Sequence, residues 1–157
     1  MLICMTHKAA ARMRRLELRA QSVTIEVTHL GEPYGVWSAR HRLTAVGDTH
    51  TIVECVNALW NDRPVGTPLK VGVVLGDLIP VRSATRPLFD EHVELERVSE
   101  AMDRINQKLG DHTVYLAGMH GAQPHDPMRI AFTQIPEVRR MHAMPASAAL
   151  RHTPHER

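Results

Sequence analysis

The chain has 157 residues with a hydrophobic content of 43%, which is enough for one domain with a real core. Its formal net charge of +2 at pH 7 is too small to indicate a polyanionic partner by itself, although the charges are unevenly distributed. No apolar run is long enough to span a membrane and no secretory signal pattern is present, so we expect a cytoplasmic protein without a membrane partner. Cys4 and Cys55 lack metal-like spacing, and we expect Cys55 to be a core residue.

The first predicted element is a helix from Thr6 to Leu18 with an apolar stripe and a basic stripe. The basic stripe contains Lys8, Arg12, Arg15 and Arg19. Like charges at this spacing disfavour an isolated helix by about 0.2–0.5 kcal/mol per pair, unless an anion offsets them. The stripe is therefore either a solvated face or a row that follows phosphates, and the sequence leaves both interpretations open.

Two segments of alternating polarity, residues 22–28 and 36–43, predict a hairpin across the turn-rich residues 31–35. Arg40 and Arg42 fall on the polar face of the second strand. His41 falls on its apolar face, where we expect a buried and hydrogen-bonded histidine. A helix then begins at Asp48 or Thr49 as the N-cap and ends before residue 64.

The segment from Leu69 to Leu78 is the most apolar in the chain and predicts the central strand of a sheet. Its second face is small and carries Lys70. After a loop at residues 81–91, a helix with an apolar stripe from Leu95 to Leu109 precedes Gly110 as the C′ residue. A short strand at residues 113–117 is expected to close the domain.

The order α-β-β-α-β-α-β predicts an α+β domain in two layers, with helices on one face of a four-stranded, mainly antiparallel sheet. We expect this domain at residues 6–118, a C-terminal extension at 119–137 and a disordered tail at 138–157. The open face of the sheet then carries Arg40, Arg42 and Lys70 among hydroxyls and glycines, which suits contacts with phosphates. Only Tyr115 is expected there as an aromatic residue that could stack on a base.

No group of residues predicts catalysis, because paired carboxylates, a phosphate-binding glycine loop and an activated nucleophile are all missing at a persuasive spacing. The nearest histidine pairs, His120 with His125 and His152 with His155, lack a third ligand. We therefore expect neither a metal nor another cofactor. A small-molecule-binding regulatory domain is disfavoured because the sheet face has no pattern of a concave apolar pocket.

Together these features resemble the C-terminal little finger domain of Y-family translesion DNA polymerases, closest to the bacterial polymerase V type. The resemblance covers about residues 6 to 137. It rests on the basic helix at 7–15, the strand at 23–27, the sequence Gly-Asp-Leu-Ile-Pro at 76–80, and residues 101–106 before Gly110. It implies a non-catalytic domain that grips primer-template DNA during lesion bypass and DNA repair, with Arg40, Arg42 and Lys70 as contacts. The family's palm, fingers and thumb lie upstream of this region, so we do not expect this chain to polymerise DNA alone.

In the polymerase V type, the loop before the last helix carries a sliding-clamp motif of the form Gln-Leu-x-Leu-Phe. The matching segment here keeps Leu88 and Phe89 after Pro87, but has Thr85 and Arg86 in place of the leading Gln and Leu. The resemblance thus implies an alternative function, a protein-interaction module that docks on the sliding clamp or a polymerase partner through residues 87–89. The other interpretation is that the apolar pair packs under its own loop.

Overall fold

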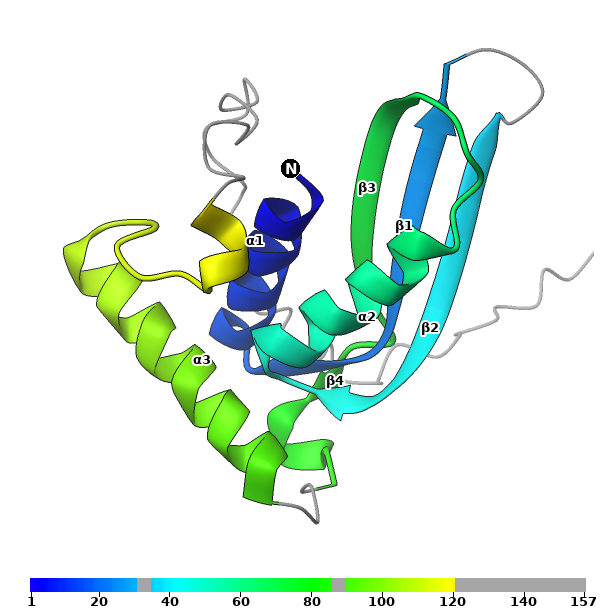
Figure 1. Ribbon diagram of the computed structural model, residues 1–157. Coiled ribbons are helices and arrows are strands. Elements are labelled where there is room, and N and C mark those ends of the chain that lie inside the picture. The colour runs from blue at the N-terminus through cyan, green and yellow to red at the C-terminus, as the bar shows by residue number, and fades with distance from the viewer. Residues whose placement is uncertain (31–34, 86–89, 121–157) are drawn as a thin grey trace, which may run out of the picture. The chain divides into compact units, whose positions relative to one another are not determined.

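The computed structural model describes residues 1–30, 35–85 and 90–120, which all belong to one compact unit (Figure 1). Its helices are α1 (Leu2–Arg15), α2 (Thr49–Asn61), α3 (Asp90–Leu109) and a short 3-10 helix (Val81–Ser83). Its strands are β1 (Leu18–His29), β2 (Val36–Val46), β3 (Pro68–Gly76) and β4 (Ile79–Pro80). The predicted class is confirmed as α+β with an open, mainly antiparallel four-stranded sheet. Within the described ranges, no helix is both long enough and apolar enough to cross a membrane.

The middle strand of the sheet is β1, which pairs antiparallel with β2 on one side and β3 on the other. The prediction that the segment from Leu69 to Leu78 is central is therefore wrong. That prediction relied on the apolar content of the segment. In the structure, however, Val74 of β3 is 51% exposed, whereas Val23 and Ile25 of β1 are fully buried. β4 pairs with the first residues of β1 in the same register as β3, so β3 and β4 form one strand that is interrupted at residues 77–78.

The core lies between the sheet and two helices, α1 and α2, which cover one sheet face (Figure 1). Its buried residues are Ala10, Met13, Ala20, Val23, Ile25, Ile52 and Val56. Cys55 packs against this cluster while remaining partly exposed, which agrees with the expectation of a small residue at the core. The third helix, α3, packs on α1 and α2, so among the described residues no helix covers the opposite face of the sheet, which we call the open face.

The ends of two helices follow the signals in the sequence. Asp48 caps α2, because its carboxylate accepts a hydrogen bond from the backbone N–H of Thr51 at 2.7 Å. Gly110 follows α3 with a φ of 112°, and its N–H donates to the carbonyl of Asn106 at 3.0 Å. Glycine adopts this left-handed conformation without steric cost, which explains its place after the helix.

The strand predicted at residues 113–117 is wrong, and the order of the described elements is α-β-β-α-β-β-α. Residues 111–116 are turns and irregular backbone, and residues 117–120 form a 3-10 helix. The side chain of Asn106 ties this segment to α3, because it bonds the carbonyl and N–H of Val114 at 2.8 and 2.9 Å. Tyr115 therefore leaves the predicted sheet face, and its hydroxyl lies 2.8 Å from Nδ1 of His120. His41 is exposed instead of buried, because β2 is an edge strand that the helices cover only in part.

Candidate functional site

The open face of the sheet is built from alternate residues of β1, β2 and β3, and most of its side chains are short or polar. Across the three strands the paired positions run Arg42–Ser22–Gly76, Arg40–Thr24–Val74, Ser38–Glu26–Gly72 and Val36–Thr28–Lys70. The predicted cations Arg40, Arg42 and Lys70 thus share this face, and all three are exposed. No aromatic residue occupies any of these positions, so the face suits contact with the sugar-phosphate backbone of a nucleic acid better than stacking on its bases.

Arg40 is held on the open face by two acceptors. Its guanidinium forms an ion pair with the Asp77 carboxylate and donates a hydrogen bond to Oγ of Ser22 at 3.2 Å. Both partners of the ion pair are about half exposed, with side-chain exposures of 54% and 51%. Hydrogen bonds from Ser22 and then from Arg40 lower the pKa of Asp77, so this carboxylate stays ionised at neutral pH.

The interruption between β3 and β4 explains how Asp77 reaches Arg40 and Ser22, with which it forms a polar cluster. Asp77 has a φ of 50°, a left-handed conformation that breaks the strand directly after Gly76. A Cβ atom at Gly76 would lie only 2.7 Å from Oγ of Ser22, so glycine allows the serine to approach the cluster. Asp77 was not among the residues predicted for this face, although the Gly-Asp pair inside an apolar run was a local signal of a break in the strand.

The charges on the open face are unequally spaced. Arg40 and Arg42 are neighbours on β2, whereas Lys70 pairs with Thr28, four residues along β1 from the partner of Arg40. At about 3.3 Å per residue this separates Lys70 from the arginines by roughly 13 Å along the strands. Glu26 lies exposed between them, so three cations share the face with two carboxylates. Because Asp77 pairs with Arg40, the two cations and one carboxylate at the arginine end give the same net charge of +1 as Lys70 gives at the other end.

The row of four cations predicted along one helix is wrong. α1 ends at Arg15, and Arg19 belongs to β1, where it donates to Glu96 of α3 at 2.6 Å. The side chains of this pair are only 12% and 17% exposed, so Arg19 fixes α3 and is not presented to solvent. Burial raises the pKa of Glu96, and the charge of Arg19 opposes that rise. Lys8, Arg12 and Arg15 are exposed on α1, on the side of the sheet opposite Arg40.

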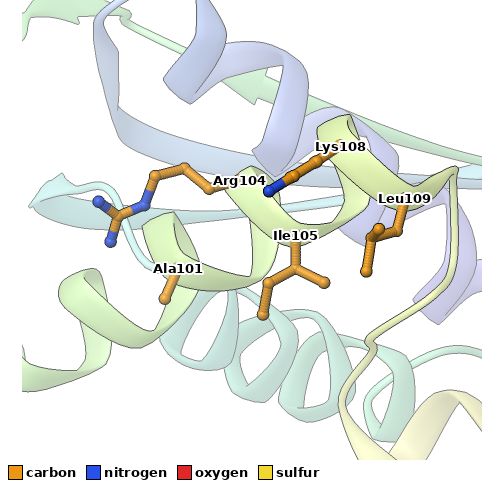
Figure 2. A pocket seen from close by; sticks show the side chains of 5 residues that line it. All are labelled: Ala101, Arg104, Ile105, Lys108 and Leu109. Atoms are coloured by element: carbon orange, nitrogen blue, oxygen red, sulfur yellow. The ribbon is translucent and has the colours of Figure 1, made fainter.

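A shallow hollow lies on the outward side of α3, away from the sheet (Figure 2). It is lined by Ala101, Arg104, Ile105, Lys108 and Leu109. This lining contains apolar groups and two cations but no carboxylate, thiol, hydroxyl or histidine, so it lacks the pair of a nucleophile and an adjacent general base.

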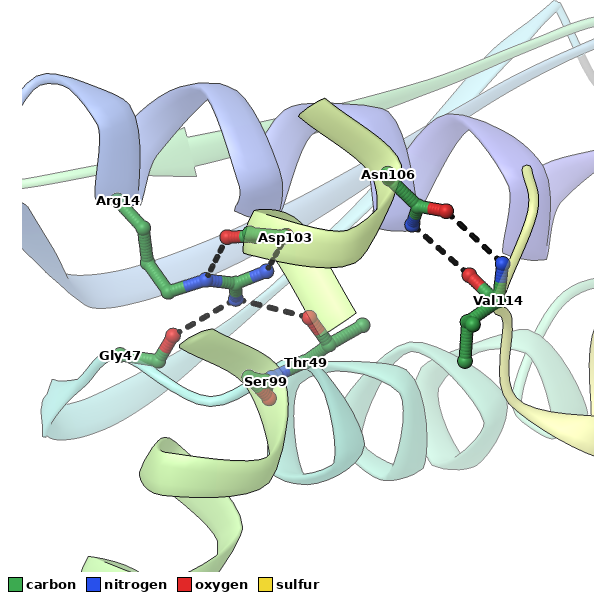
Figure 3. A network of polar contacts seen from close by, with 7 residues as sticks. All are labelled: Arg14, Gly47, Thr49, Ser99, Asp103, Asn106 and Val114. Carbon is green, nitrogen blue, oxygen red and sulfur yellow. Dashed lines mark hydrogen bonds and ion pairs between the residues drawn. The ribbon is translucent and has the colours of Figure 1, made fainter. Parts of the chain in front are cut away.

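Arg14 is a key residue that the sequence analysis did not identify (Figure 3). Its guanidinium binds both carboxylate oxygens of Asp103 at 2.7 and 2.9 Å, and one Nη donates to the carbonyl of Gly47 and to Oγ1 of Thr49 at 2.9 and 2.8 Å. The backbone N–H of Thr49 donates to Oγ of Ser99 at 3.1 Å. These contacts join α1, α2 and α3, and no local sequence signal links residues so far apart.

Two expectations stay untested by this geometry. Pro87, Leu88 and Phe89 lie outside the described residues, so clamp binding through this loop remains a prediction. The extension and tail predicted beyond residue 120 also lie outside them. In the described ranges, His, Cys, Asp and Glu side chains do not gather in groups of three or more that could hold a metal ion.

Residues 1–88 match the C-terminal domain of the impB/mucB/samB family. The chain is also similar to protein UmuC of Salmonella typhimurium, with 33% identity over 102 residues that cover 60% of this chain and 24% of UmuC. It therefore spans about a quarter of the length of that curated relative. No solved structure gives a significant match to the chain.

Proposed function

Since the chain belongs to the impB/mucB/samB family of Y-family polymerases through the family's C-terminal little finger domain, we propose that it grips the backbone of primer-template DNA. In this proposal the domain contributes affinity and position on DNA, and the chemistry of nucleotide transfer lies in other parts of such a polymerase. The observation that carries the proposal is the open sheet face, where Arg40 and Arg42 stand beside hydroxyls and glycines.

The chemistry of this face supports contact with phosphates and not with base edges. Thr24 and Thr28 supply short hydroxyl side chains along the middle strand, and Gly72 has open space above it in which a nucleic-acid backbone can approach closely. Most protein–DNA hydrogen bonds go to phosphate and sugar from arginine, lysine and hydroxyl groups of this kind. Such contacts position a protein on a duplex without reading its sequence.

The salt dependence of DNA binding tests the proposal directly. If Arg40, Arg42 and Lys70 each neutralise one phosphate, log K should fall against log salt with a slope of about −2.7. The measurement is fluorescence anisotropy of a labelled primer-template duplex, titrated with the full chain at several salt concentrations. Saturable binding with this slope supports the proposal, and a slope near zero contradicts it.

A matched pair of variants locates the contact. Arg40→Ala and Arg42→Ala should each weaken binding and reduce the magnitude of the salt slope by about 0.9. Arg15→Ala removes an exposed cation from α1, on the opposite side of the sheet, and should leave both quantities unchanged. If Arg15→Ala weakens binding and the two sheet variants do not, the DNA-binding surface is the helical one.

A further inference from the structure

The outward side of α3 carries an apolar stripe that no described element covers. Val98, Ile105 and Leu109 are 51%, 38% and 65% exposed, and with Ala101 they recur at intervals of three or four residues along one helix face. Figure 2 shows Ala101, Ile105 and Leu109 pointing to the same side of the helix. Exposed apolar side chains in a continuous row, unlike single ones, indicate a surface that binds a partner.

A row of cations runs beside this stripe. Three exposed cations each directly precede an apolar residue of the stripe in the sequence: Arg97, Arg104 and Lys108. None of them forms an ion pair with a described residue. Of the acidic residues described on the same helix, Asp103 and Glu96 bind Arg14 and Arg19, and Glu94 and Glu100 lie closer to the helix N-terminus than the residues that line the hollow. The hollow itself is therefore apolar with a positive rim.

The contacts of α3 with the rest of the domain fix which side of this helix faces solvent. Arg14 binds Asp103 and Arg19 binds Glu96 on the side opposite the stripe, and the side chain of Asn106, about 100° around the helix from Ile105, binds Val114. A helix held at these three levels cannot rotate its apolar stripe into the domain without breaking several hydrogen bonds. The exposure of Ile105 and Leu109 is thus a consequence of how α3 is anchored.

We propose that this side of α3 binds an acidic amphipathic helix of a partner protein, in a site distinct from the open face of the sheet. The apolar residues of the partner would cover Ala101, Ile105 and Leu109, in the way an amphipathic helix fills a groove. Its carboxylates would lie against Arg104 and Lys108, where they gain favourable charge pairing.

Charge complementarity selects this occupant over the two others that the chain itself offers. Two copies of α3 that met at the hollow would bring Arg104 and Lys108 against the same cations of the other copy. Residues 121–157 contain five arginines against three acidic residues, so this segment carries the wrong sign as well. Duplex DNA has the right sign, but its phosphates cannot cover the exposed side chains of Ile105 and Leu109.

The test uses the full chain and a labelled synthetic helix of about 20 residues, a length at which an isolated helix can form. This probe has leucines along one stripe and glutamates on both flanks, and a second probe replaces every glutamate with lysine. We expect saturable binding of the acidic probe, and affinity for the basic probe that is at least about tenfold weaker. Equal binding of both probes, or no binding of either, overturns the proposal.

Variants show whether the probe occupies the hollow. Ile105→Asp should lower the affinity for the acidic probe by about tenfold or more. The double variant Arg104→Glu with Lys108→Glu should bind the basic probe more tightly than the acidic one. Gln107→Glu, an exposed change on α3 outside the hollow, should leave binding within about twofold and controls for general charge effects. Circular dichroism checks that each variant remains folded.

Two further outcomes would overturn the choice of occupant. Displacement of the acidic probe by unlabelled duplex DNA would mean that the hollow binds nucleic acid. Self-association in sedimentation velocity that Ile105→Asp abolishes would mean that a second copy occupies it. DNA titrations of Ile105→Asp should match those of the unmodified chain, so failure of the sheet to bind DNA and failure of this site remain distinguishable.

Discussion

Replacing Arg14 with Ala tests whether polar contacts hold α3 on the rest of the domain. The Arg14 side chain is 11% exposed and donates four hydrogen bonds, two of them to the carboxylate of Asp103. Hydrogen bonds to a charged group contribute about 1.5–3 kcal/mol each, and neutral ones about 1 kcal/mol. Breaking a fully buried pair costs about 3–5 kcal/mol, and Asp103 is 30% exposed and regains water, so we expect a loss at the lower end, about 3 kcal/mol.

Chemical unfolding followed by circular dichroism measures this loss, and a parallel thermal melt should show a decrease in Tm of about 10 °C. Arg15→Ala is the matched control, because Arg15 is exposed at the end of the same helix and should change stability by less than about 0.5 kcal/mol. A double-mutant cycle with Asp103→Asn should give a coupling energy of at least about 1 kcal/mol. Equal stabilities of the Arg14 and Arg15 variants, or a coupling near zero, would refute this account.

Three further predictions concern the sheet face, the half-buried His7 and the loop before α3. Asp77→Asn removes a carboxylate from the open face and releases the neighbouring guanidinium, so affinity for duplex DNA should rise by about threefold in the anisotropy titration; a decrease would contradict the proposed contact. Burial, followed by the charges of neighbouring basic groups, lowers the pKa of His7 from 6.5 to about 4. The folded protein then binds fewer protons than the unfolded chain between these values, so stability is full above pH 6.5 and falls as the pH drops toward 4. Because His7 is partly exposed, we expect a loss of about 1–2 kcal/mol, which His7→Asn should remove and His92→Gln, at an exposed site, should leave in place. Finally, Leu88→Ala with Phe89→Ala should weaken capture by a sliding clamp at least about tenfold while DNA affinity stays constant; unchanged capture would exclude this loop as the anchor.

Local patterns in the sequence were sufficient for most of the helices and strands and for the faces of the strands. Strict alternation places Arg40 and Arg42 on one side of β2 whatever its neighbours are, because successive side chains of a strand point to opposite faces. The cap at Asp48 and the glycine at 110 were equally readable, because they satisfy hydrogen bonds within a few residues of themselves.

The tertiary structure alone decided how these elements are combined. β1 became the middle strand because it pairs with three other strands, whereas apolar content had favoured β3. The strand expected at residues 113–117 does not form. The side chain of Asn106 makes hydrogen bonds with the carbonyl and N–H of Val114, which in a strand would bond a neighbouring strand.

The sequence by itself determined the family resemblance, the α+β class and the face that carries Arg40, Arg42 and Lys70. Only the tertiary structure placed Arg19 against Glu96, Arg14 against Asp103 and Asp77 against Arg40. These pairs join residues 77, 89 and 37 positions apart. Pairing at such separations depends on the packing of whole helices and strands, so a charged residue gives no local sign of whether it will face solvent, DNA or a buried partner.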